Sequence, residues 1–229
     1  RLGQGLRLRL GARVGRGRGG GRAVVAHGGA GTPAPRAAIV TVSTGVLAAG
    51  AIAFDPPLPI ATRQAIHDLP MGLLTKIAFR ADDPEAPDLP AFASVRRAVE
   101  APDDRPMSFL SRLFHDPLLI GFCGGARAWE MLHDAPALEA AARAEIATIF
   151  GARAAAALGQ ATVTRWGEAP LVLGAYTHPV PGAQAARRVL GTPLADGRLC
   201  FAGEACHPRF AATVAGAWLS GTEAARAVP

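Results

Sequence analysis

The most informative segment of this 229-residue chain is Gly197-Arg198-Leu199-Cys200-Phe201-Ala202-Gly203-Glu204-Ala205, followed shortly by Ala212-Thr213-Val214-Ala215-Gly216-Ala217-Trp218-Leu219-Ser220-Gly221. The apolar run at residues 198–202 predicts a buried strand that ends in a glycine-glutamate turn. The run of small residues at 213–227 predicts a helix after a short loop. A strand, turn, loop and helix in this order predict the ligand-facing edge of an α/β sheet.

The predicted turn and helix start both have the chemistry of a ligand contact. Gly203 lets bare backbone approach a ligand closely, and Glu204 offers a carboxylate to ligand hydroxyls or to an ordered water. A helix that opens near Thr213 directs free N–H groups, that of Val214 among them, and its positive dipole end outward. The small residues that allow the helix to pack closely, with or without a ligand, are Gly216, Ala217 and Gly221.

These segments resemble the carboxy-terminal flavin motif of the flavin-containing amine oxidases, the superfamily of monoamine oxidases, polyamine oxidases and lysine-specific histone demethylases. The resemblance implies an α/β fold, in which a Rossmann-like FAD-binding domain of the amine oxidase type accompanies an α+β substrate domain. It also implies that the helix dipole at Val214 balances negative charge on reduced flavin. The residues that the resemblance assigns to FAD are Val14, Trp166, Gly203, Glu204, Thr213, Val214 and Ala217.

One expected part of such a domain is missing from the sequence. The G-x-G-x-x-G fingerprint, which binds the FAD pyrophosphate at a strand-to-helix turn, does not occur in it. The glycine-rich residues 16–21 alternate with arginine and lack the flanking apolar strand and helix. We therefore expect a carboxy-terminal fragment that begins at Arg1, whose FAD domain lacks its N-terminal βαβ unit and whose partner is the missing N-terminal half of the same protein.

The pattern along the chain predicts three segments. Residues 1–52 should supply strands of the FAD domain, with a meander of short strands at residues 6–14 and 22–27. The resemblance implies that the backbone at Val14 lies near the adenine. Residues 37–42 are nearly all apolar and predict a strand buried on both faces, followed by hydroxyl caps for a short helix. Three prolines between Asp55 and Pro59 predict a rigid domain crossing. Residues 53–181 should form the substrate-binding domain, and residues 182–229 should return to the FAD domain.

Further elements follow from hydrophobic spacing and from helix start and stop signals. Residues 82–105 are polar and proline-rich, which predicts a surface loop with one short helix. The expected strands include residues 22–27, 71–79 and 118–123, and the expected helices include residues 60–69, 126–132, 135–150 and 183–190.

Lys76 is the only lysine in a chain that otherwise uses arginine, which indicates a place where a titratable ammonium is wanted. It aligns with the family lysine that holds a water against flavin N5, so the resemblance implies a catalytic role. Partial burial would lower its pKa, and as a cation it could stabilise superoxide character during reoxidation. A lone lysine on such a strand also commonly points into solvent.

Two aromatic residues resemble the substrate side of the family's flavin site. Trp166 matches the segment that lines the isoalloxazine, and Tyr176, the only tyrosine, would steer the amine and serve catalysis. Ala175 stands where some monoamine oxidases have a flavin-linked cysteine, which excludes covalent attachment there and implies non-covalent FAD. Thr213 stands where monoamine oxidases have the second of two aromatic residues that enclose the substrate amine. The resemblance therefore implies a substrate contact at Thr213 that disfavours small arylalkylamines.

The resemblance implies FAD-dependent oxidation of a small-molecule amine. Hydride would pass from the amine α-carbon to flavin N5, the imine would hydrolyse, and O2 would be reduced to H2O2. Lys76 with Tyr176 favours this chemistry over an amino-acid oxidase or a desaturase of the same fold. An inactive fragment and a basic module that binds nucleic acid are two competing hypotheses.

Composition bears on partners and location. The net charge of +6 owes much to arginines in residues 1–22, but no aromatic residues interleave there, so we expect no nucleic-acid partner. No apolar run reaches the ~18 residues of a membrane-spanning helix, so we expect no span. Three cysteines in apolar surroundings favour reduced thiols and a cytoplasmic location. The histidines and cysteines lack metal-ligand spacing, so we expect no metal.

Overall fold

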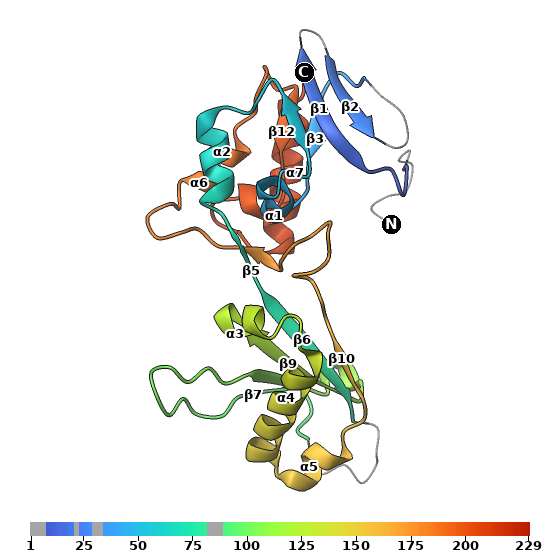
Figure 1. The fold of residues 1–229 in the computed structure, drawn as a ribbon, viewed down its shortest axis with the longest axis vertical. Coiled ribbons are helices and arrows are strands. Elements are labelled where there is room, and N and C mark those ends of the chain that lie inside the picture. The colour runs from blue at the N-terminus through green and yellow to red at the C-terminus, as the bar shows by residue number, and fades with distance from the viewer. Residues whose placement is uncertain (1–7, 21–22, 29–33, 82–88) are drawn as a thin grey trace. The chain divides into compact units, whose positions relative to one another are not determined.

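The computed structural model describes residues 8–20, 23–28, 34–81 and 89–229, and divides into two compact units (Figure 1). Unit 1 comprises Arg1–Met71, Pro170–Val172 and Tyr176–Pro229. Unit 2 comprises Gly72–Ala169 and Leu173–Ala175. Each unit has its own apolar core, as the sequence allows.

The described part of unit 1 contains a three-stranded sheet and the β3–β12 pair. β1 (Val14–Gly20) lies between β2 (Ala23–Gly28), which is antiparallel to it, and β4 (Ala53–Asp55), which is parallel. β3 (Ala38–Val40) runs parallel to β12 (Leu199–Phe201), so the predicted strands near residues 37–42 and 198–202 are direct neighbours.

Two expectations for these strands are wrong. Of the strand expected at residues 6–14, residues 6 and 7 lie outside the described residues, and residues 8–13 form no strand. β1 begins at Val14 and continues through the arginine-glycine run, because the ladder to β2 uses backbone groups that glycine also provides. β3 is not buried on both faces, since Ile39 is 38% exposed where β3 pairs with β12 alone in the described chain.

The helices of unit 1 surround the β3–β12 pair. α1 (Thr44–Ala48) starts at the predicted hydroxyl cap, where Ser43 Oγ accepts the Val46 N–H at 3.2 Å. The other helices are α2 (Ile60–His67), α6 (Ala186–Gly191), the 3-10 turn η2 (Glu204–Cys206) and α7 (Val214–Ala227). The main buried apolar residues of this unit are Leu58, Ala65, Ile66, Leu69, Ala186, Leu190, Phe201, Ala205 and Cys206.

The compact units do not divide at the proline-rich segment. Leu58, Ile66 and Leu69 pack with Leu190 and Phe201, so residues 53–71 belong to unit 1, and the chain enters unit 2 at Gly72. Residues 176–181 likewise belong to unit 1. The assignment of the segments to a flavin domain and a substrate domain stays a prediction.

Unit 2 is built on a five-stranded antiparallel sheet of order β10-β6-β9-β8-β7. Its strands are β6 (Leu74–Arg80), β7 (Ala93–Val95), β8 (Ser108–Ser111), β9 (Leu118–Gly124) and β10 (Ala161–Val163). Two further short strands, β5 (Met71–Gly72) and β11 (Tyr176–Thr177), pair where the chain passes between the units.

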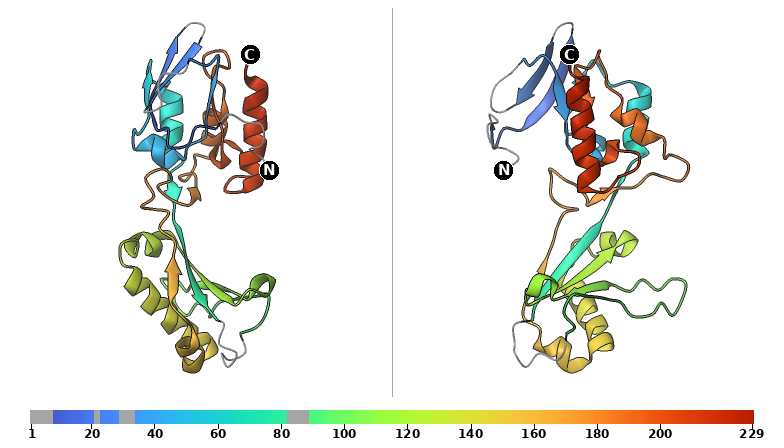
Figure 2. Two further views of the ribbon diagram at one scale, coloured as in Figure 1. Left: turned by 90° about the vertical axis from the view of Figure 1, so that its right-hand side faces the viewer. Right: turned by 180° about the vertical axis from the view of Figure 1, so that it is seen from behind.

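Helices cover one face of this sheet (Figure 2). α4 (Ala135–Phe150) starts where Asp134 Oδ1 accepts the Ala137 N–H at 2.9 Å, and it buries Leu138, Ala142 and Ile146 against the sheet. The remaining helices are α3 (Gly125–Glu130), α5 (Ala152–Ala157) and the 3-10 turn η1 (Leu113–His115).

The expected loop at residues 82–105 differs from the structure. Its described part, residues 89–105, contains β7 and no helix, because Ala93, Ser94 and Val95 complete a ladder with β8. Partner strands distant in sequence supply those hydrogen bonds, so the local pattern does not reveal them.

Gly121 sits at the centre of the sheet, opposite Ile77 on β6 and Phe109 on β8. Gly121→Ala should destabilise unit 2 by about 1–3 kcal/mol, because the added methyl would lie 2.9 Å from atoms of both side chains. Urea unfolding measures the difference. Gly159→Ala, whose new methyl would lie 3.4 Å from Arg80 Cβ, is the control and should change stability by less than about 0.5 kcal/mol. Equal unfolding midpoints for the two variants would contradict the expectation.

Candidate functional site

The turn after β12 presents bare backbone, as predicted. Gly203 has φ +146°, which disfavours other residues, and a methyl group built on it would meet no atom within 4 Å. Ser220 on α7 holds the turn in place, since its Oγ accepts the Gly203 N–H at 2.9 Å and lies 2.8 Å from the Gly203 carbonyl oxygen. The turn is therefore fixed from the α7 side and open on the side where a side chain would project.

Glu204 has a different set of partners from the expected ligand hydroxyls. Its Oε1 accepts the Thr177 N–H at 2.8 Å, and its Oε2 accepts the Thr177 hydroxyl at 2.9 Å and the Ala212 N–H at 2.7 Å. The carboxylate thus joins β11 to the loop that precedes α7. Its side chain stays 23% exposed, and its contact with FAD stays a prediction.

Arg187 on α6 completes this arrangement, and sequence reasoning missed it. The residue is 6% exposed, and its guanidinium donates to the Thr177 hydroxyl at 2.8 Å and to the Thr177 carbonyl at 3.2 Å. Burial lowers the pKa of Arg187, while the nearby Glu204 carboxylate raises it. A signal did exist: Arg187 lies between Ala186 and Leu190 on the apolar face of a helix, where a charged residue needs buried partners.

The start of α7 offers two backbone donors. Thr213 Oγ1 caps the helix by accepting the Gly216 N–H at 3.0 Å and donates to the Phe210 carbonyl at 2.6 Å. The first intrahelical bond runs from Ala217 N to Thr213 O, so the N–H groups of Val214 and Ala215 have no partner within the helix. Val214 is 88% exposed. These N–H groups at the positive helix end suit a ligand with negative charge on one edge.

Close packing of α7 against the protein is confirmed at Gly216, whereas at Gly221 an approach to the flavin stays a prediction. A methyl on Gly216 would lie 1.9 Å from the Phe210 carbonyl oxygen, so the close approach is to the preceding loop. A methyl on Gly221 would meet nothing within 4 Å. Ala217 is exposed, and its carbonyl oxygen lies 3.0 Å from the Oγ of buried Ser220, one turn further along α7.

His207 shapes the loop between η2 and α7. It is 7% exposed, and its Nδ1 accepts the N–H groups of Arg209 at 3.2 Å and Phe210 at 2.9 Å. Its ring lies 5.3 Å from that of Phe210, centroid to centroid. The loop that delivers Thr213 is therefore fixed by its own residues.

Tyr176 belongs to the same unit and is joined to the turn through its neighbour Thr177. Its ring is 39% exposed. Unit 1 thus brings together Tyr176, Gly203, Glu204 and the start of α7. Val14 is 40% exposed and begins β1, in the sheet of order β2-β1-β4. It makes none of the contacts described above.

Lys76 and Trp166 belong to unit 2. Lys76 is exposed, with its Nζ 5.7 Å from the centroid of the Phe122 ring, so the expected partial burial is not provided by this chain. Thr164 holds the backbone of Lys76, accepting its N–H on Oγ1 at 2.9 Å, which brings the segment before Trp166 beside β6. Trp166 is 48% exposed.

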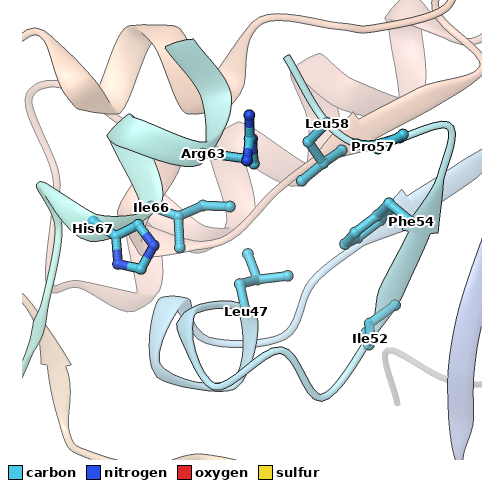
Figure 3. A pocket seen from close by; sticks show the side chains of 8 residues that line it. All are labelled: Leu47, Ile52, Phe54, Pro57, Leu58, Arg63, Ile66 and His67. Atoms are coloured by element: carbon cyan, nitrogen blue, oxygen red, sulfur yellow. The ribbon is translucent and has the colours of Figure 1, made fainter. Parts of the chain in front are cut away.

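A cavity of about 210 Å³ in unit 1 lies elsewhere (Figure 3). Leu47 and Ile66 point into it from α1 and α2, and Arg63 and His67 stand on α2 at its edge. None of the predicted site residues lines this cavity. Its lining residues are Leu47, Ile52, Phe54, Pro57, Leu58, Arg63, Ile66 and His67.

The cysteines are free and buried, and burial raises the pKa of Cys206 to about 12. Within the described ranges, no three histidine, cysteine, aspartate or glutamate residues are grouped closely enough to hold a metal ion. In the same residues, no helix has both the length and the apolar character needed to cross a membrane.

The fold is mixed α/β, and comparisons with known proteins identify the family. The family described as flavin containing amine oxidoreductase matches residues 1–229. The chain is similar to Lysine-specific histone demethylase 1 homolog 3 of Oryza sativa subsp. japonica, with 33% identity over 194 residues that cover 80% of this chain and 23% of that protein. With Polyamine oxidase 4 of the same organism it shares 30% identity over 199 residues, covering 82% and 38%. The chain belongs to the flavin-containing amine oxidase family, and the resemblance seen in residues 197–221 is confirmed.

Solved structures show the same fold. Cyclohexylamine oxidase from Brevibacterium oxydans IH-35A matches with a TM-score of 0.73 and 24% identity, over 94% of this chain and 47% of that one. Wild-type putrescine oxidase bound to putrescine matches with a TM-score of 0.78 and 20% identity, over 94% and 48%. The chain therefore spans about half the length of these structures and a smaller share of its curated relatives. A mixed α/β fold is shown, and the absence of one βαβ unit stays a prediction.

Two glycines of α7 give a matched test of how the helix is seated. Gly216→Ala should cost about 3 kcal/mol, because the new methyl collides with the backbone oxygen of Phe210. Gly221→Ala should be neutral or should stabilise by about 0.5–1 kcal/mol, since it replaces glycine in a helix without a collision. Thermal unfolding compares them. A Gly216→Ala protein as stable as the unmodified one would show that α7 is not seated on this loop.

Proposed function

We propose that the protein uses non-covalent FAD to oxidise an amine. Family membership supports flavin-dependent amine oxidation. The observation that carries the proposal is the pairing of the open Gly203 backbone with the exposed N–H groups at the start of α7, held together by Ser220.

The residues of unit 1 fit one end of a flavin. The N–H of Val214 would face the pyrimidine edge, where a reduced flavin carries negative charge, and Gly203 would let the ligand come close to backbone. Glu204 would keep its exposed side for the ribityl chain. When bound, FAD supplies the two-electron acceptor for the reaction. The other residues proposed to contact it are Val14, Trp166, Thr213 and Ala217.

The chain's own side chains would act on the amine and on a proton. Tyr176 presents an exposed ring face that would orient the amine, which oxidation requires in its neutral form. Thr213, as a small polar residue at the start of α7, would leave room for a substrate that is not a small arylalkylamine. Lys76 would hold a water and accept or return its proton. Ala175 offers no thiol for a covalent link.

Completion of the FAD site is proposed to come from residues of the same protein outside this chain. The sequence has no glycine-rich strand-to-helix turn for the pyrophosphate, and the chain spans about half of the solved structures that it matches. O2 is the proposed electron acceptor, which would be reduced to H2O2.

A direct test uses the purified full protein saturated with FAD and a panel of putrescine, cyclohexylamine and a methylated lysine peptide. At least one amine should bleach the flavin absorbance without oxygen, and oxygen should then restore it with release of peroxide. The proposal fails if FAD binds and no amine bleaches it, or if no FAD binds.

Lys76 allows a sharper test of the site. Lys76→Met should lower kcat by about 100-fold while the bound FAD content is unchanged, because the variant loses a proton carrier and not a cofactor contact. Stopped-flow absorbance measures flavin reduction and reoxidation separately. Arg96→Met, which removes another exposed cation of unit 2, is the control and should leave both rates unchanged. Reduction and reoxidation rates equal to those of the unmodified protein would remove Lys76 from the mechanism.

A further inference from the structure

Arg187 and Thr177 form a buried polar network with Glu204 in unit 1, and neither of the two has a role in the proposed reaction. Arg187, 6% exposed, donates from one nitrogen to the Thr177 hydroxyl at 2.8 Å and from the other to the Thr177 carbonyl at 3.2 Å. The same guanidinium lies 3.8 Å from Glu204 Oε2. Thr177 is itself 3% exposed, so the two residues meet inside the unit.

The hydrogen bonds have a fixed direction. Arg187 has only donors, so the Thr177 hydroxyl accepts from it and gives its single proton to Glu204, 2.9 Å away. Glu204 takes two further donors, the N–H groups of Thr177 and Ala212. The Thr177 hydroxyl and both carboxylate oxygens of Glu204 are thereby engaged in one arrangement.

Both ends of this network stop beside proposed substrate contacts. Thr177 follows Tyr176 on β11, and Ala212 precedes Thr213 at the start of α7. A displacement of either backbone would therefore move Tyr176 or Thr213.

We propose that Arg187 is a positioning residue, which through Thr177 and Glu204 fixes Tyr176 and Thr213 relative to each other. This inference rests on the proposed function for the roles of Tyr176 and Thr213, whereas the positional effect is a property of unit 1 alone.

Arginine is required for geometric reasons. Its planar fork reaches the hydroxyl and the carbonyl of one residue at once, and a lysine ammonium on a flexible stem does not reproduce that pair. The buried charge also needs Glu204 close by, because an unpaired guanidinium in the interior is strongly disfavoured. A third hydrogen bond, to the Ala205 carbonyl at 3.3 Å, joins the same side chain to η2. That contact gives Arg187 a structural role as well, so the test has to separate stability from positioning.

Tyr176 supplies the readout, because it is the only tyrosine in this sequence. The full protein labelled with 3-fluorotyrosine gives a fluorine NMR signal for Tyr176, assigned as the signal that Tyr176→Phe removes. The measurement needs neither FAD nor substrate. The variants are Arg187→Lys, Thr177→Val, Thr177→Ser and, as the matched control, Arg188→Lys, since Arg188 is the exposed neighbour on α6.

In Arg187→Lys and Thr177→Val, the Tyr176 signal should broaden or split, and kcat/KM for the amine should fall by about 10- to 100-fold, mostly through kcat. Thr177→Ser keeps the hydroxyl, so its Tyr176 signal and its kcat/KM should match those of the unmodified protein. Arg188→Lys should match the unmodified protein in both.

An unchanged Tyr176 signal in folded Arg187→Lys would overturn the inference. If that variant does not fold, Thr177→Val decides, and an unchanged signal there overturns it equally. If the protein oxidises no amine but the Tyr176 signal still changes in these variants, the proposed function is wrong and the positional role of Arg187 is supported.

Discussion

The arrangement of unit 1 depends on one carboxylate. Glu204 accepts three donors from two separate segments and so joins the strand that carries Tyr176 to the loop that precedes α7. A carboxylate that accepts several N–H and O–H groups is held in one orientation. Glu204 therefore joins two segments of unit 1 to each other. A ligand would contact only the part of its side chain that stays exposed.

The elements that the sequence predicted best are those whose causes are local. Ser43 caps α1 because a hydroxyl precedes a helical turn, and β12 and α7 follow from an apolar run and a run of small residues. The role of Arg187 was not predicted, because it depends on contacts with Thr177 and Glu204 that only the fold creates. Lys76 is exposed in this chain, and strand spacing predicts the face on which it lies but not what covers that face.

The two sides of α7 show how one helix serves packing and ligand at once. Gly216, Ser220 and Ala224 form a buried side that seats the helix on the loop and on Gly203. The opposite side carries Val214 and Trp218, 88% and 59% exposed, which is unusual for large apolar residues on a helix that is otherwise well packed. The sequence predicts that small residues of α7 make close contacts. It does not predict which of these residues lie against backbone atoms of another segment.

The hydrogen bonds around Glu204 join residues that are near in sequence, separated by 27 positions at most, whereas Ser43 bonds to Val172 across 129 positions. Contacts with short loops close quickly and at low entropic cost, and parallel strand pairing between distant segments closes late. The hydrogen bonds around Glu204 can therefore form while β3 is still unpaired with β12. Loop-closure entropy therefore favours formation of the hydrogen bonds around Glu204 before β3 pairs with β12.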